Sequence, residues 1–178
     1  GGHGKARDPL VHLLEKRLYA SPQEKEMAEA QLLEEEGKFG EAKAAFGRLA
    51  RDYPYEKLAW YGLGEAQYHD RRESGGSVGE SLAAFERAVA LDPDFLLPYR
   101  HIFDVLWDRG LIDEAIQRAD QLLAREPTKP LWHRYRAASI ALTGDISRTR
   151  AALAEAESHV STVEDRRELY TDLAFAWA

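Results

Sequence analysis

Residues 110–115 read GLIDEA, and the same pattern occurs at three other places in the chain. The other copies are GKFGEA at 37–42, GSVGES at 76–81 and GDISRT at 144–149. Each copy begins with glycine, has an apolar third residue and has a small sixth residue. The last three copies follow one another at intervals of 34 residues, and the first precedes the second by 39. This spacing indicates an internal repeat, which decides the fold.

Proline closes the first three repeats, at Pro54, Pro93 and Pro127. Proline cannot continue a helix, and a glycine just past a helix end adopts the left-handed backbone that other residues resist. The small sixth residue lets two antiparallel helices approach closely. Between these marks apolar residues recur at helical spacing, as they do in 80–91. Each repeat is therefore predicted to be a helix, a tight turn, a second helix and a closing turn.

The best-formed repeat resembles the tetratricopeptide repeat (TPR) family. It reads LAWYGLGEAQY at 58–68 and ESLAAFERAVALDPD at 80–94. The resemblance implies an all-α, right-handed solenoid of antiparallel helix pairs, in which each repeat has a helix A and a helix B. The residues that match the family's two helices are Trp60, Leu63, Gly64, Phe85, Ala88 and Pro93.

The other repeats match the family less completely. The third has Phe103 where the family usually has a small residue, which predicts a wider helix crossing there. The first has Glu26 in place of an aromatic residue of helix A, and the fourth has Ser161 in place of the closing proline. We place the four repeats at 23–56, 57–95, 96–129 and 130–161.

Both ends of the repeat array carry helix-capping patterns. SPQE at 21–24 predicts one helix start, and STVED at 161–165 predicts another. Residues 1–22 combine GGHG, which we interpret as a tag scar, with an amphipathic helix expected to cover the open end of the first repeat. Residues 162–178 are expected to form a capping helix or the start of a truncated fifth repeat, so we interpret the chain as a piece of a longer protein.

The glycine-rich stretch SGGSVGES at 74–81 invites comparison with a phosphate-binding loop. Such a loop needs glycine, four residues, then Gly-Lys and Ser or Thr. Ser74 stands where the first glycine should be, and Glu80 replaces the lysine and would repel a phosphate. We therefore predict no nucleotide and no other cofactor. We interpret 71–75 as a five-residue lengthening of the repeat's turn, with a contact loop for a partner as the alternative.

The composition is that of an acidic protein without cysteine. The formal net charge is -7, whereas non-specific nucleic-acid binding requires clustered Lys and Arg. The lack of cysteine excludes disulfides and thiolate metal sites. No apolar run reaches the roughly 18 residues that a bilayer-spanning helix needs, and no signal peptide is visible. We predict a cytoplasmic protein that binds neither nucleic acid nor membrane.

Histidines and carboxylates form no recognisable catalytic or metal-binding pattern. His69, His101 and His133 are 32 residues apart, so they drift against the 34-residue repeat and face different ways. None of them pairs at i, i+4 with another histidine or carboxylate in a known metal arrangement, and no Ser-His-Asp arrangement can be placed. We predict no metal site and no enzymatic activity.

The resemblance also implies a concave groove lined by helix A of each repeat, with partner contacts at fixed positions. These positions hold Tyr61, Glu65, Tyr68 and His69 in the second repeat and Arg100, Asp104, Trp107 and Asp108 in the third. They hold Arg134, Ala138 and Ala141 in the fourth repeat, and Met27, Gln31 and Glu34 in the first.

The chemistry of these positions indicates what kind of partner would bind. The family's two-carboxylate clamp for chaperone C-termini needs Lys and Asn in the groove, and Asn is absent here. Aromatic residues and arginine are typical of interface centres. The mixed lining therefore predicts an extended segment or a helix of another protein, and Trp107→Ala or Arg100→Glu is expected to abolish its binding while leaving the fold intact.

Two alternative functions remain open at this point. The lengthened second repeat is similar to TPR regions of bacterial signalling proteins, so the chain could be a regulatory or sensor domain of a larger enzyme such as a serine/threonine kinase, or of a transcription regulator. The other alternative is self-association through the last helix, burying Tyr170, Phe175 and Trp177.

Overall fold

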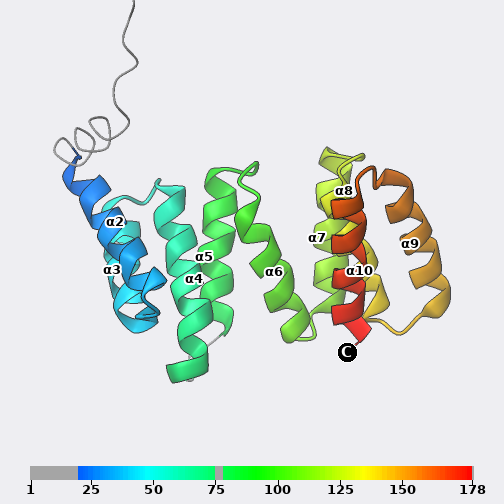
Figure 1. Ribbon diagram of the computed structural model, residues 1–178, viewed down its shortest axis with the longest axis horizontal. Coiled ribbons are helices and arrows are strands. Elements are labelled where there is room, and N and C mark those ends of the chain that lie inside the picture. Colours follow the sequence, from blue (N-terminus) through cyan, green and yellow to red (C-terminus); the bar gives the residue numbers. More distant parts are fainter. Residues whose placement is uncertain (1–19, 75–77, 178) are drawn as a thin grey trace, which may run out of the picture. The chain divides into compact units, whose positions relative to one another are not determined.

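The computed structural model describes residues 20–74 and 78–177, except for the side chains of 71–74, 78 and 175–177. All regular secondary structure within these residues is α-helical (Figure 1), which confirms the prediction of an all-α repeat fold. The helices are α2 (Pro22–Glu35), α3 (Phe39–Asp52), α4 (Lys57–Ser74), α5 (Val78–Leu91), α6 (Leu97–Asp108), α7 (Ile112–Arg125), α8 (Pro130–Ala141), α9 (Ile146–His159) and α10 (Val163–Trp177).

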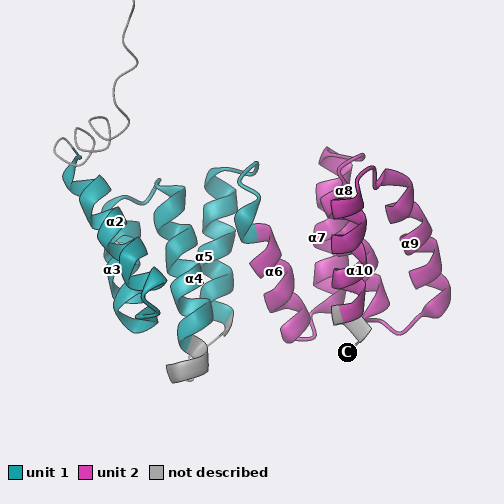
Figure 2. Ribbon diagram, viewed as in Figure 1, with its two compact units in different colours: residues 1–98 teal, residues 99–178 magenta. Residues whose placement is uncertain are grey.

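The chain divides into two compact units, which Figure 2 shows in different colours. Unit 1 ends at Pro98 and contains α2 to α5; unit 2 begins at Tyr99 and contains α7 to α10. The division falls near the start of α6, so nearly all of that helix belongs to unit 2.

Glycine turns join helix A to helix B as the sequence predicts. Gly37, Gly110 and Gly144 have φ angles of 74°, 68° and 75°, the left-handed backbone that favours glycine. After Gly37 the amide of Lys38 donates to the carbonyl of Leu33 at 2.9 Å, which closes the end of α2. Gly76, the corresponding residue of the second repeat, lies outside the described residues.

The four B helices, α3, α5, α7 and α9, are each 14 residues long. Each begins two residues after the turn glycine, and the first three end two residues before the closing proline. The fourth ends two residues before Ser161, so this departure from the family leaves the helix length unchanged. The small sixth residues are buried, as predicted: Ala42, Ser81, Ala115 and Thr149 are at most 3% exposed.

Helix α4 corrects the expectation for the insertion at 71–75. The helix has 18 residues and continues through Ser74, whereas α6 and α8, the next two A helices, have 12 residues each. Most of the insertion therefore extends the helix instead of lengthening the turn. Residues 75–77, on which the contact-loop alternative partly depends, lie outside the described residues.

Unit 1 is held together by close packing of glycines on α4 against aromatic rings. A Cβ at Gly62 would lie 2.4 Å from the ring of Phe46, and one at Gly64 would lie 2.6 Å from the ring of Phe85. Both rings are almost fully buried. A buried carboxylate, Asp70 on α4, also pairs with Lys43 on α3. Helix α4 is thus fixed by both of its B-helix neighbours.

Unit 2 ends in α10, which packs on α8 through the buried side chains of Leu169 and Leu173. The predicted caps are present at both helix starts. Ser21 and Glu24 form a complete capping box on α2. On α10 the cap is Thr162, whose Oγ1 accepts from the amide of Asp165 at 3.0 Å. Across residues 20–74 and 78–177, no helix is long and apolar enough to span a membrane.

Candidate partner-binding surfaces

The four predicted contact residues of unit 1 form one stripe along α4. Tyr61, Glu65, Tyr68 and His69 are all partly exposed, and the helix period brings them to one side of α4. The ring of Tyr61 meets Phe95 edge-on at 5.3 Å, and the ring of Tyr68 meets His69 edge-on at 5.5 Å. These contacts hold each tyrosine in place while part of its surface stays open to solvent.

His69, the last residue of this stripe, is held by a contact with α3. Its ring stacks on Phe39 of α3, with a centroid distance of 5.0 Å. Its Nε2 lies 3.9 Å from the Glu65 carboxylate, beyond hydrogen-bonding distance. Helix α2, which also contacts α4, adds the partly exposed Met27 and Glu34 and the exposed Gln31 to the predicted contact positions.

Lys57, at the start of α4, is engaged within unit 1. Its ammonium pairs with Asp92, and it lies 5.0 Å from the centre of the Phe95 ring. The hydrogen bond from Lys57 lowers the pKa of the Asp92 carboxyl, and the amide of Asp94 adds to the effect. This pair fastens the turn after α5 to the beginning of α4.

In unit 2, α6 places Arg100, Asp104 and Asp108 along one side. The Arg100 side chain is 78% exposed, and its Nε lies 3.9 Å from the carboxylate of Asp104. Burial raises the pKa of the Asp104 carboxyl, although His101 and Arg100 oppose the shift. Asp104 is thus a partly buried carboxylate next to a long cationic side chain at the surface.

Trp107 lies in the core of unit 2, with an exposure of 8%. Its Nε1 donates to Ser139 Oγ at 3.0 Å, and that hydroxyl donates to the carbonyl of Tyr135 at 2.7 Å. The indole also contacts the rings of Phe103 and Tyr135. Truncating Trp107 would remove packing between α6 and α8, so a loss of binding in Trp107→Ala would not identify a contact residue.

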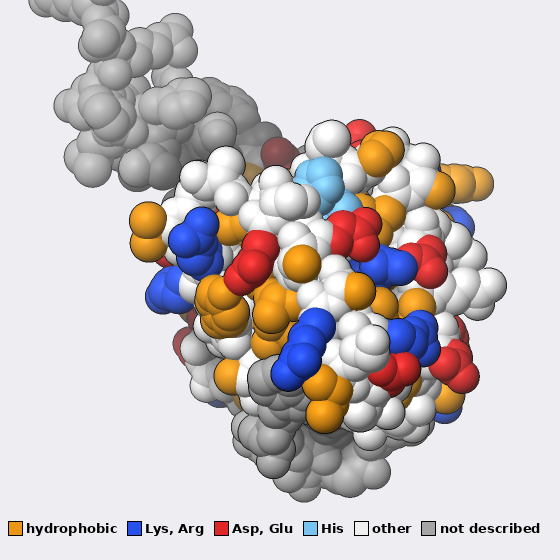
Figure 3. Space-filling view, turned by 90° about the vertical axis from the view of Figure 1, so that its right-hand side faces the viewer, with side chains coloured by type: hydrophobic (Ala, Val, Ile, Leu, Met, Phe, Trp, Pro, Cys, Tyr) orange, Lys and Arg blue, Asp and Glu red, His pale blue; other side chains and the backbone are white. Residues whose placement is uncertain are grey.

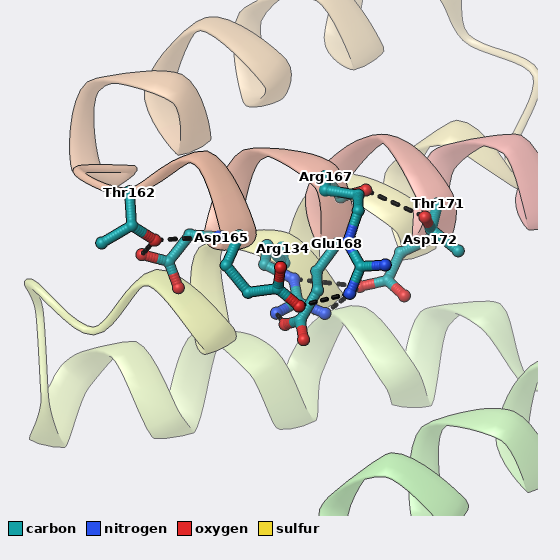
Figure 4. A network of polar contacts seen from close by, with 8 residues as sticks. Arg134, Thr162, Asp165, Arg167, Glu168, Thr171 and Asp172 are labelled. Carbon is teal, nitrogen blue, oxygen red and sulfur yellow. Dashed lines mark hydrogen bonds and ion pairs between the residues drawn. The ribbon is translucent and has the colours of Figure 1, made fainter.

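Arg134 is 7% exposed and joins α8 to α10 (Figure 4). Its Nε and Nη2 donate to Asp172 Oδ2 at 3.1 and 2.9 Å, and its Nη1 donates to Glu168. Burial raises the pKa of the Asp172 carboxyl, while the charge and hydrogen bonds of Arg134 oppose the rise. Each of the three guanidinium nitrogens thus donates to a carboxylate of α10. The other two predicted positions on α8, Ala138 and Ala141, are buried as well.

The sequence profile of the tetratricopeptide repeat family matches residues 27–94 and 102–159, which make up more than half of the chain. The chain belongs to the TPR family. TPR repeats are generally protein-interaction modules and non-enzymatic scaffolds. No curated protein sequence matches the chain.

Solved structures of other TPR proteins have the same fold. TTC0263, a thermophilic TPR protein of Thermus thermophilus, superposes with a TM-score of 0.64 at 17% identity, over 93% of this chain and 88% of that one. YrrB, described as a TPR protein with an unusual peptide-binding site, superposes with a TM-score of 0.59 at 12% identity, over 97% of this chain and 84% of that one. At these identities the likeness concerns the fold alone.

The largest fully buried side chain of unit 2, Trp132, was not predicted from the sequence. Trp132 is fully buried, meets Tyr99 edge-on at 4.9 Å, and donates from Nε1 to Glu126 at 3.0 Å. It follows Tyr99 by 33 residues, one less than the repeat length, so a strict 34-residue alignment passes over it. Trp60, which does match the family's helix A, is only partly buried.

His133, one of the three spaced histidines, is a buried structural residue. Its Nε2 lies 2.7 Å from the Pro127 carbonyl, so this nitrogen donates, and its ring stacks on His159 of α9 at 3.9 Å. Burial lowers the pKa of His133 below its ordinary value of 6.5, and the proximity of His159 and Arg136 acts in the same direction. The Pro127 carbonyl and the carboxylate of Glu155, 3.8 Å from Nδ1, oppose the shift.

We expect the stability of unit 2 to fall as the pH drops below 6.5, the ordinary pKa of histidine. Because the folded-state pKa is lowered, the unfolded chain binds the proton first, and acidification favours unfolding. Urea denaturation at pH 7.5, 6.5 and 5.5 measures this dependence. His133→Phe keeps a ring in the stack and should flatten the profile; an unchanged slope in that variant would assign the dependence to other groups.

Helices α9 and α10 of unit 2 expose several large apolar side chains. Ile146, Val163 and Tyr170 are 68%, 89% and 46% exposed. Figure 3, viewed from the α9 side, shows hydrophobic side chains scattered between charged ones. The hydroxyl of Tyr170 donates to Glu157, which draws that ring along α9. Phe175 and Trp177, the other residues of the self-association hypothesis, have side chains outside the described ones, and the hypothesis stays a prediction.

Proposed function

We propose that this chain binds a peptide or helical segment of another protein along its A helices, that it acts in the cytoplasm, and that it has no catalytic activity of its own. The observation that supports the proposal most is the stripe on α4. Two tyrosines, a glutamate and a histidine are held there by neighbouring rings and remain partly exposed. Interface centres favour aromatic residues in such supported positions.

The burial of individual side chains narrows the set of proposed contacts. In unit 1 they are Tyr61, Glu65, Tyr68 and His69. In unit 2 they are Arg100, Asp104 and Asp108, because Arg134 and Trp107 are buried and already engaged with neighbouring helices. The latter two residues support the surface and do not contact the partner directly.

The proposal predicts that variants on the A helices and on the B helices differ in binding. Twelve-residue peptides selected from a random displayed library with the whole chain serve as probes. We expect each of the substitutions Tyr61→Ala, Tyr68→Ala and Arg100→Glu to lower the affinity for the selected peptides about tenfold, which corresponds to about 1.4 kcal/mol of binding free energy. Isothermal titration calorimetry measures the affinities.

The controls are arginines on the B helices. Arg48 on α3 and Arg150 on α9 are exposed, and Arg48→Glu and Arg150→Glu change charge as Arg100→Glu does. Both should bind the probes as the parent chain does. An equal loss in these variants, or a library that returns no binding peptide, would refute the proposed surface.

A further inference from the structure

Three residues of the α4 stripe combine two aromatic rings with a carboxylate. On an α-helix Tyr61, Glu65 and Tyr68 lie within about 60° of one another, with the glutamate about one turn from each tyrosine. The Glu65 side chain is only 12% exposed. A carboxylate with so little water around it attracts a cation more strongly than one in open solvent.

The charged side chains among the predicted contact positions of unit 1 are acidic. The seven predicted contact positions on α2 and α4 contain two glutamates and neither lysine nor arginine. Lys57, at the start of α4, is engaged by Asp92 and the Phe95 ring. A partner segment that carries a positive charge is complementary to this surface, and an anionic segment would be repelled by it.

We propose that the surface formed by Tyr61, Glu65 and Tyr68 receives an arginine side chain of the partner segment. The planar guanidinium can stack on a tyrosine ring and donate to the Glu65 carboxylate at the same time. This inference rests on the proposed function and adds the chemistry of the partner. The acidic residues of unit 2 are a weaker place for such a charge, because Arg100 lies beside Asp104 and Arg134 pairs with Asp172 and Glu168.

The experiment compares two peptides that differ only in charge. The probes are acetylated (Gly-Ser-Arg)₄ amide and the same peptide with citrulline, which keeps the shape of arginine and removes its charge. Fluorescence anisotropy with the whole chain should show the arginine peptide binding at least tenfold more tightly. Equal binding of the two peptides would overturn the proposal, even where library peptides bind the A helices as the proposed function requires.

Matched variants separate the stripe from the general negative charge of the chain. Glu65→Gln and Tyr68→Leu should each lower the affinity for the arginine peptide about tenfold. The control is Glu41→Gln, which makes the same charge change at an exposed site on α3 and should leave this affinity unchanged. An equal loss in Glu41→Gln would overturn the proposal. Arg72 follows the stripe one turn later, and Arg72→Gln should not weaken the peptide; a loss there would indicate an anionic partner.

Discussion

Replacing Arg134 by methionine is expected to lower the free energy of unfolding by about 3 kcal/mol, at the lower end of the range for breaking a buried ion pair. The guanidinium is 7% exposed and holds Asp172 through two hydrogen bonds and Glu168 through a third. Methionine fills much of the same volume, so the loss comes mainly from the carboxylates left behind. Asp172 is 20% exposed, and the remaining water limits the effect. Urea denaturation followed by circular dichroism measures the change.

The pH dependence of this variant provides a second test of the same interaction. Burial already raises the pKa of Asp172 above 3.8, and Arg134 counteracts part of that rise. Removing the arginine should therefore raise the pKa further. A carboxyl group with a raised pKa in the folded protein binds its proton more tightly there than in the unfolded chain. Its contribution to stability is therefore fully present below the pKa of the unfolded chain, and it is lost as the pH rises through the pKa of the folded protein. The stability deficit of Arg134→Met should shrink as the pH falls from 7 toward 4.

A double variant separates the ion pair from the packing of α10 on α8. Arg134→Met with Asp172→Leu removes both charges and leaves apolar side chains in their place, which is often neutral or stabilising for a buried pair. It should recover most of the stability that Arg134→Met loses. Equal stability of Arg134→Met and the parent chain would contradict the role given to this network in Figure 4.

The helices and turns could be predicted from sequence because their determinants are local. Gly37, Gly110 and Gly144 adopt positive φ angles at the predicted turns, and each B helix ends two residues before the predicted closing position. These outcomes depend on the backbone preferences of single residues, which neighbouring repeats do not alter.

The exposure of the contact positions could not be predicted in the same way, because it depends on residues one repeat away. Trp107 is buried through Ser139, 32 residues later, and Arg134 through Asp172, 38 residues later. The family register gives the direction of a side chain from its own helix, but not the partner that the next helix supplies. Tyr68 of the α4 stripe is partly exposed, whereas Trp107, at the corresponding position on α6, is part of the core.

Phe103, which departs from the family pattern, is accompanied by a small residue at the matching position of helix B. It follows Gly64 by 39 residues, and it is fully buried and stacked on Tyr135 at 4.3 Å. Gly64 packs against Phe85, and the residue that corresponds to Phe85 in the third repeat is Ala119. The third repeat thus exchanges the large and the small residue between its two helices. The two pairs differ in volume by one methyl group, because alanine and not glycine stands opposite the large residue in the third repeat.

The close packing of Gly64 against Phe85 predicts the second large effect, which is that Gly64→Ala destabilises the protein. The new Cβ would lie 2.6 Å from both Cδ1 and Cε1 of Phe85, whose ring is fully buried and has little room to move. Overpacking of this kind costs about 3 kcal/mol at the upper end of its usual range. The better helix propensity of alanine returns about 1 kcal/mol. We expect a net loss of about 2 kcal/mol, measured by urea denaturation.

Two further variants show whether the close contact with Phe85 is the cause. In Gly47→Ala, also in a helix interior, the Cβ would meet only ordinary contacts at 3.8 and 3.9 Å, so alanine should stabilise the protein by about 0.5–1 kcal/mol. Gly64→Ala combined with Phe85→Leu should be at least about 1 kcal/mol less destabilised than the sum of the single variants, because the smaller side chain makes room for the methyl group. Strict additivity of the two changes would mean that the Gly64–Phe85 contact does not limit how closely α4 and α5 approach.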